Sequence, residues 1–202
     1  EGTMIMGAFV SYVVATQSDS LPLAILSGIL SGMVMGLIIG FMTSTLRVDH
    51  FITGLGLNLL VGGLTFFWFR IYVKGGHPPT FTGLENFSIP ILASIPFLGE
   101  VFFNQKPLTY IAILSVPVVS YFLYRTRWGL EIRCLGENPK AIDIKGLSVA
   151  LRQYIAIIIG SGMTGLGGAF LMLGFSDRFQ PDLTAGKGWL AIVAIIAGKW
   201  LP

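Results

Sequence analysis

Long, nearly uncharged apolar runs constrain the fold of this chain more than any other feature. The six runs cover 3–15, 22–46, 51–73, 108–124, 153–175 and 188–202. A helix that crosses a membrane needs about 18 to 20 such residues. Three of the runs exceed that length, one comes close, and the first and last are shorter. The pattern predicts an all-α, polytopic bundle of about six membrane-spanning helices.

The composition excludes several other classes of protein. Of the 202 residues, 53% are hydrophobic and 11% are charged, and the charged share is about half that of an ordinary soluble domain. The single cysteine, Cys134, has no second cysteine to pair with. A soluble globule, a disordered tail and a disulfide-linked secreted scaffold are therefore excluded. Because both terminal runs are short, we expect residues 1–202 to be one transmembrane domain and an internal part of a longer membrane protein.

Basic residues are distributed unevenly among the connections between runs. The connections 47–50 and 125–152 together contain seven lysines and arginines, whereas 16–21, 74–107 and 176–187 together contain four. Basic residues concentrate in cytoplasmic loops of membrane proteins. We therefore expect 47–50 and 125–152 to be cytoplasmic and 74–107 to be an extracytoplasmic loop.

Glycine spacing in the second run predicts close helix packing. Gly28, Gly32, Gly36 and Gly40 lie four residues apart and so share one helix face. Small residues let helices approach each other closely in lipid, where apolar burial does not drive association. Packing within one fold is the plain interpretation. The alternative, that some glycines line a path or allow helices to shift, stays open.

Ionisable side chains are almost absent from the runs, apart from Glu1, Arg70 and Lys199. This absence argues against ion-coupled transport and against an intramembrane hydrolase, because both need buried titratable groups. His50 and His77 have no partners at ligand spacing, so we expect no metal site. A GxxxxGK[ST] loop is also missing. The sequence thus predicts a protein that is not an enzyme, holds no cofactor and binds no nucleic acid.

Neutral polar side chains within the runs are the candidates for a substrate pathway. An amide or hydroxyl in hydrocarbon is unfavourable unless it is paired or faces water. For Asn58, both an interhelical hydrogen bond and contact with a hydroxyl-rich neutral solute remain open. The candidate pathway residues are Thr53, Asn58, Thr65, Ser161 and Thr164.

The connection 125–152 is the most charged stretch and contains signals for a short helix. Asn138 suits an N-cap, Pro139 suits the first turn, and Gly146 suits a stop. These residues predict a helix of about two turns. A solvated loop is the simple alternative. A defined helix on a protein whose spans carry no coupling charge favours a docking element for an energy-supplying partner.

A family resemblance rests on several segments of the chain. Residues 126–149, TRWGLEIRCLGENPKAIDIKGLSV, resemble the signature loop of permease subunits of bacterial ABC importers. The similarity is to the branch that takes up ribose-type sugars, nucleosides and branched-chain amino acids. EGTMIMGAF at 1–9 and TGLGLN at 53–58 resemble further segments of that family, and PILASIPFLG at 90–99 resembles its nucleoside-type members. Ile142 departs from the family, which commonly has a second alanine there.

The resemblance implies a multi-pass importer subunit of the bacterial plasma (inner) membrane that forms a pathway for nucleosides or related simple sugars. It implies as partners a second permease, identical or different, two cytoplasmic ATP-binding subunits that hold the ATP, and an extracytoplasmic solute-binding protein. Another solute of the family, a pentose, hexose or branched-chain amino acid, and a secondary transporter are the alternatives. The residues that the resemblance assigns to coupling with the ATPase are Gly136, Glu137, Asn138, Pro139, Lys140, Ala141, Asp143 and Gly146.

Overall fold

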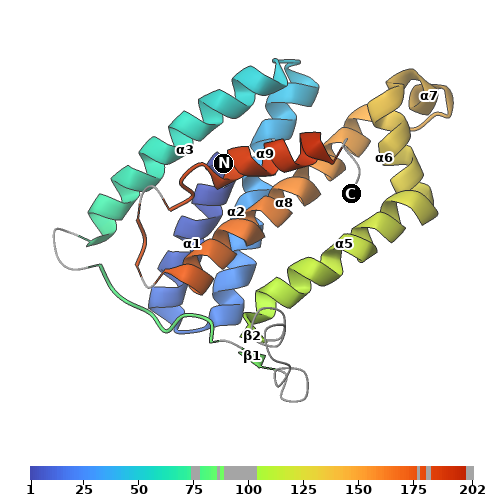
Figure 1. Cartoon of the computed structure of the whole chain (residues 1–202). Coiled ribbons are helices and arrows are strands. Elements are labelled where there is room, and N and C mark those ends of the chain that lie inside the picture. The colour runs from blue at the N-terminus through green and yellow to red at the C-terminus, as the bar shows by residue number, and fades with distance from the viewer. Residues whose placement is uncertain (74–77, 86, 89–103, 177, 181–182, 199–202) are drawn as a thin grey trace.

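The computed structural model describes residues 1–73, 78–85, 87–88, 104–176, 178–180 and 183–198. Helices make up most of this part of the chain, which confirms the predicted all-α bundle (Figure 1). Two-residue strands β1 (Phe87–Ser88) and β2 (Asn104–Gln105) pair antiparallel. The helices are α1 (Gly2–Ser18), α2 (Leu21–Gly40) with its π-helical extension η1 (Phe41–Thr45), α3 (His50–Val73), α5 (Pro107–Arg125), α6 (Arg127–Glu137), α7 (Pro139–Ile144), α8 (Val149–Phe175) and α9 (Lys187–Ala197).

Within the described residues, four helices are long and apolar enough to cross a membrane. They cover Leu21–Thr45, His50–Val73, Pro107–Arg125 and Val149–Phe175, and coincide with the four longest apolar runs. The first and last runs form α1, of 17 residues, and α9, of 11 residues. Of the roughly six spans expected, four are thus helices of spanning length within the described residues, and the first and last runs form shorter helices.

Three helices, α1, α2 and α8, form the packed centre of the bundle. Glycines bring their backbones close together, since a Cβ placed on Gly7 would lie 2.7 Å from the Cα of Gly165. Ala8 and Tyr12 on α1 are fully buried. Dispersion between closely packed backbones replaces the hydrophobic driving force that lipid does not supply. The centre is thus built on close contact of small residues.

The two ends of the bundle differ in character. Figure 1 shows the α2–α3 turn and the α6–α7 pair at one end, and the α1–α2 turn with β1 and β2 at the other. We call these the α7 end and the β end. The connections 47–50 and 125–152 thus share an end, as alternating spans require. Much of the connection 74–107, including the motif at 90–99, lies outside the described residues.

Candidate functional site

One face of α3 lines an open groove and meets other elements closely only around Asn58. His50, Gly54, Asn58 and Gly62 lie four residues apart and share this face. A Cβ placed on Gly54 or Gly62 would meet no atom within 4 Å. Two cavities lie along the face. One of about 250 Å³ reaches from His50 to Asn58, and one of about 530 Å³ reaches from Asn58 to Gly63.

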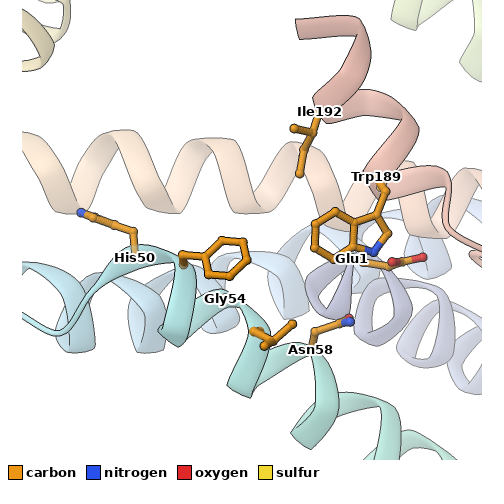
Figure 2. Close-up of a pocket in the computed structure, with 9 residues that line it drawn as sticks. Glu1, His50, Gly54, Asn58, Trp189 and Ile192 are labelled. Carbon is orange, nitrogen blue, oxygen red and sulfur yellow. The ribbon is translucent and has the colours of Figure 1, made fainter. Parts of the chain in front are cut away.

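Three side chains line both cavities and so mark the place where they meet. They are Glu1, which precedes α1, Asn58 in the middle of α3, and Trp189 near the start of α9. Figure 2 shows these three side chains toward one end of the first cavity and His50 toward the other. We call the three residues the junction. They bring together a carboxylate, an amide and an indole.

Two glycines allow the backbones at the junction to approach closely. A Cβ on Gly2 would lie 2.9 Å from the Cα of Asn58, and a Cβ on Gly188 would lie 3.1 Å from the Cβ of Glu1. The start of α1 therefore lies between α3 and α9, because Gly2 allows close contact with α3 and Gly188 allows close contact with Glu1. The side chains of the junction lie on three elements that touch through glycine.

Hydrogen bonding at the junction is incomplete within the described residues. The backbone N–H of Gly186, which has φ 79°, donates a 2.8 Å hydrogen bond to Oε1 of Glu1. Asn58 Oδ1 is buried without a hydrogen-bond partner in the described part of the chain. A carboxylate and an amide are expensive among apolar helices unless they pair with each other, with water or with a ligand. The junction is therefore a polar site with capacity for further hydrogen bonds.

The other predicted pathway residues do not gather at the junction. Thr65 is fully buried and donates to the backbone O of Val61 at 2.8 Å, within its own helix. Ser161 packs against Gly36 at the interface of α2 and α8. Thr164 is exposed, and its Oγ1 donates to the backbone O of Gly160. Of the five candidates, Asn58 is the one that lies at the junction.

Thr53 lines a separate, apolar cavity between α2 and α3. This cavity has a volume of about 670 Å³, and its other lining residues include Met35, Leu57, Leu60 and Trp68. The Thr53 Oγ1 is buried without a hydrogen-bond partner among the described residues. A cavity this apolar offers little to a hydroxyl-rich solute. Thr53 and Asn58 therefore face different surroundings although both lie on α3.

The glycines of α2 pack against α8 and its neighbours. A Cβ on Gly28 would lie 2.9 Å from Cβ of Ala169, and one on Gly32 would lie 3.0 Å from Cα of Gly165. Further along, Gly36 meets Ser161 and Gly40 meets the ring of Tyr154. The four-residue spacing in α2 therefore forms a helix interface. Gly54, Gly56, Gly62 and Gly63 of α3, in contrast, have no atom within 4 Å of a Cβ placed on them.

Helices α6 and α7 form a capped pair at the α7 end. Thr126 Oγ1 accepts from Gly129 N–H at 3.1 Å, and Asn138 Oδ1 accepts from Lys140 N–H at 3.2 Å. Each bond satisfies a backbone donor that a helix start leaves free. The stop is at Gly146, which has φ 73°. The helix begins at Pro139 as the sequence predicted, although six residues make it shorter than two turns.

The candidate coupling residues form an exposed surface around one buried anchor. Ile142 is 2% exposed, whereas the next residue but one, Ile144, is 87% exposed. Ile142, where the resemblance would lead one to expect alanine, thus has a structural role, since its buried side chain anchors α7 beside α6. The residues assigned to coupling, all of them exposed, are Gly136, Glu137, Asn138, Pro139, Lys140, Ala141, Asp143 and Gly146.

Sequence reasoning did not select Glu1 and Trp189 as site residues. Glu1 was recognisable as an acidic residue beside an apolar run, and Trp189 follows the glycines at 186 and 188. Their convergence with Asn58 depends on contacts between residues as much as 185 positions apart. Among the described residues, no group of three or more His, Cys, Asp or Glu side chains could hold a metal ion.

Four apolar helices of spanning length among the described residues, with an exposed capped helix pair at one end, are the features of a polytopic membrane protein. The family model described as "Branched-chain amino acid transport system / permease component" matches residues 1–202, and the chain belongs to this family. The family is a transport component, not an enzyme, as the sequence predicted.

Similar proteins occur in archaea and bacteria. A provisionally named glucose ABC transporter permease protein of Haloferax volcanii is 37% identical over 206 residues. A nucleoside ABC transporter permease protein of Lactococcus lactis is 33% identical, and a guanosine ABC transporter permease protein of Bacillus subtilis is 32% identical. All of this chain is covered in each case, and it spans 61%, 66% and 66% of these relatives, respectively. No solved structure matches the chain significantly.

Proposed function

We propose that this chain forms the membrane pathway in one half of an ABC importer for nucleosides or related simple sugars. The observation that carries the proposal is the α6–α7 pair, which presents exposed residues around the buried Ile142. A rigid, capped projection can transmit the movement of a partner into the bundle, whereas a flexible loop cannot. The partner at this surface is a cytoplasmic ATPase, which places the α7 end in the cytoplasm.

The energy source in this proposal lies outside the chain. Two ATP-binding subunits close when they bind ATP and separate after hydrolysis, and α7 moves with the ATPase surface that it occupies. The described spans contain few charged groups that could couple transport to an ion gradient. This chain therefore needs no cofactor of its own and binds no nucleic acid.

The solute is a neutral molecule with several hydroxyl groups. The relatives named for glucose, a nucleoside and guanosine support this class. The polar groups of the junction suit hydrogen bonding to such a solute. Pentoses, other hexoses and branched-chain amino acids are the competing solutes within the family.

In this proposal, each end of the bundle faces a different partner, and a second permease lies beside the chain in the membrane. A second permease, either another copy or a related subunit, completes the pathway in the bacterial plasma membrane. An extracytoplasmic solute-binding protein delivers solute at the β end. The exposed Gly136–Gly146 surface belongs to the ATPase at the opposite end.

Reconstitution of the permease with its ATPase and binding protein in proteoliposomes tests the function. We expect uptake of labelled uridine or glucose that requires ATP. Ala141→Glu places a charged side chain on the exposed surface of α7 and should abolish both ATPase association and uptake. Gln17→Glu, exposed at the β end, is the matched control. Uptake driven by an ion gradient without ATP, or normal ATPase association with Ala141→Glu, would contradict the proposal.

A further inference from the structure

We propose that the junction of Glu1, Asn58 and Trp189 is a binding site for a solute ring that carries two adjacent hydroxyl groups. This inference rests on the proposed function and goes beyond it, because it assigns the residues that hold the solute. Two of these residues, Glu1 and Trp189, were not among the candidates from sequence. The three side chains line both cavities of the α3 groove.

The polar groups of the junction complement a diol. Two carboxylate oxygens offer about four acceptor positions, and the N–H of Gly186 occupies one of them. An amide supplies N–H donors as well as an acceptor. One hydroxyl group can donate to Glu1 and its neighbour to Oδ1 of Asn58, while their oxygens accept from the amide N–H groups of Asn58. A cation could be held by the Glu1 carboxylate and by Oδ1 of Asn58, but it would leave the amide N–H donors of Asn58 and the indole of Trp189 without a role.

The indole of Trp189 supplies an apolar surface beside these polar groups. The residue is 48% exposed at the start of α9 and faces the cavities that contain Glu1 and Asn58. An aromatic face binds the apolar face of a ring, either of a sugar or of a nucleobase. Carboxylate, amide and indole together therefore recognise both the edge and the face of a hydroxylated ring.

The position of the junction suits a site from which the solute can leave. The cavities of about 250 and 530 Å³ lie on either side of it along α3. Gly54 lines the first cavity and Gly62 the second, and neither contributes a side chain that would narrow it. A solute held at the junction can thus move along the face of one helix toward either end. Productive transport requires binding that is strong enough to select and weak enough to release.

The test compares uptake of a parent solute with that of an analogue lacking the hydroxyl pair. The assembled transporter takes up labelled uridine or 2′,3′-dideoxyuridine, and labelled glucose serves as a second parent solute. The same binding protein delivers solute to every variant, so its own preference cancels when variant and wild-type ratios are compared. Glu1→Gln and Asn58→Leu should each lower uptake of the parent solute about tenfold. The first weakens the hydrogen bond between a solute hydroxyl and the carboxylate, and the second removes the hydrogen bonds to the amide. Uptake of the deoxygenated analogue should change less than about twofold, because the analogue lacks the hydroxyl groups that would bond to Glu1 and Asn58.

Trp189→Leu should lower uptake of parent and analogue alike, because both keep a ring. Asp19→Asn, in the α1–α2 turn, and Trp68→Phe, elsewhere on α3, are the matched controls. ATPase activity stimulated by the binding protein verifies that each variant is assembled. Equal losses for parent and analogue with Glu1→Gln and Asn58→Leu would overturn this inference while wild-type uptake upheld the proposed function. A wild-type complex that transports neither parent would overturn both.

Discussion

The guanidinium of Arg152 joins the α6–α7 pair to the longest helix of the bundle. Its Nε–H donates a 2.7 Å hydrogen bond to Oε2 of Glu131 on α6, and it lies 5.0 Å from the ring centre of Trp128. Arg152 itself is in the first turn of α8. Because α8 packs along α1 and α2, a displacement of α6 is carried directly into the packed centre.

Breaking the bond between Arg152 and Glu131 should uncouple ATP hydrolysis from transport. We expect Glu131→Gln to lower uptake per ATP hydrolysed several-fold, since a partly buried ion pair contributes on the order of 1–3 kcal/mol. The ratio of solute imported to phosphate released is the measurement. The reversed pair, Glu131→Arg with Arg152→Glu, should recover part of that ratio. An unchanged ratio in Glu131→Gln would show that the ion pair does not carry the movement.

Ile142 and Ile144 form a matched pair for testing the anchor of α7. Ile142→Ala removes a buried side chain, and buried Ile→Ala changes cost about 2–5 kcal/mol. Ile144→Ala removes one that is 87% exposed and should have little effect on folding. Hydrogen exchange of the backbone amides of 140–146 should become about tenfold faster or more with Ile142→Ala. Similar exchange in the two variants would mean that α7 does not depend on this side chain.

Glycines on α8 should respond to substitution according to what surrounds them. A Cβ on Gly165 would lie 3.0 Å from the Cα of Gly32, so Gly165→Ala should force α2 and α8 apart and destabilise the bundle by about 1–3 kcal/mol. Gly160 is on the same helix, and a Cβ there meets nothing within 4 Å. Gly160→Ala should be neutral or stabilising. Thermal unfolding in detergent compares the two, and equal melting temperatures would contradict the close packing of α2 on α8.

Tyr12 gives a fourth test, at the β end. Its hydroxyl donates a 2.8 Å hydrogen bond to the backbone O of Pro79, and the residue is fully buried. Tyr12→Phe should lower the free energy of unfolding by about 1 kcal/mol, because the carbonyl loses its partner in the interior. Tyr121→Phe on α5, where the tyrosine is 68% exposed, is the control. Equal stability of the two variants would indicate that the Pro79 bond contributes nothing.

Local sequence signals were sufficient to predict those features of the fold that depend only on residues close together in the chain. The caps at Asn138 and Gly146 predicted where α7 begins and ends, because an N-cap and a positive φ are set within a few positions. Run length likewise predicted the helices of spanning length. The first and last runs also form helices, α1 of 17 residues and α9 of 11, which are shorter than the four of spanning length.

The candidate site could not be predicted in the same way. Glycines recur in both α2 and α3, yet those of α2 touch α8 whereas Gly54 and Gly62 face open space. Spacing alone does not reveal which glycine has a neighbour. The contact of Glu1 with Gly186 likewise joins distant parts of the chain. Asn58 was selected because an amide within an apolar run is recognisable without knowledge of its partners.

The open face of α3 also affects how stiff that helix is. Glycine disfavours a helix by about 1 kcal/mol relative to alanine, and Gly54, Gly56, Gly62 and Gly63 all lack side-chain or backbone neighbours at their Cβ positions. A helix with four such residues bends at small expense. The glycines of α2, wedged against α8, have no such freedom. We therefore expect the α3 wall of the groove to bend more easily than the α2–α8 interface, so that the groove can change its width while that interface stays packed.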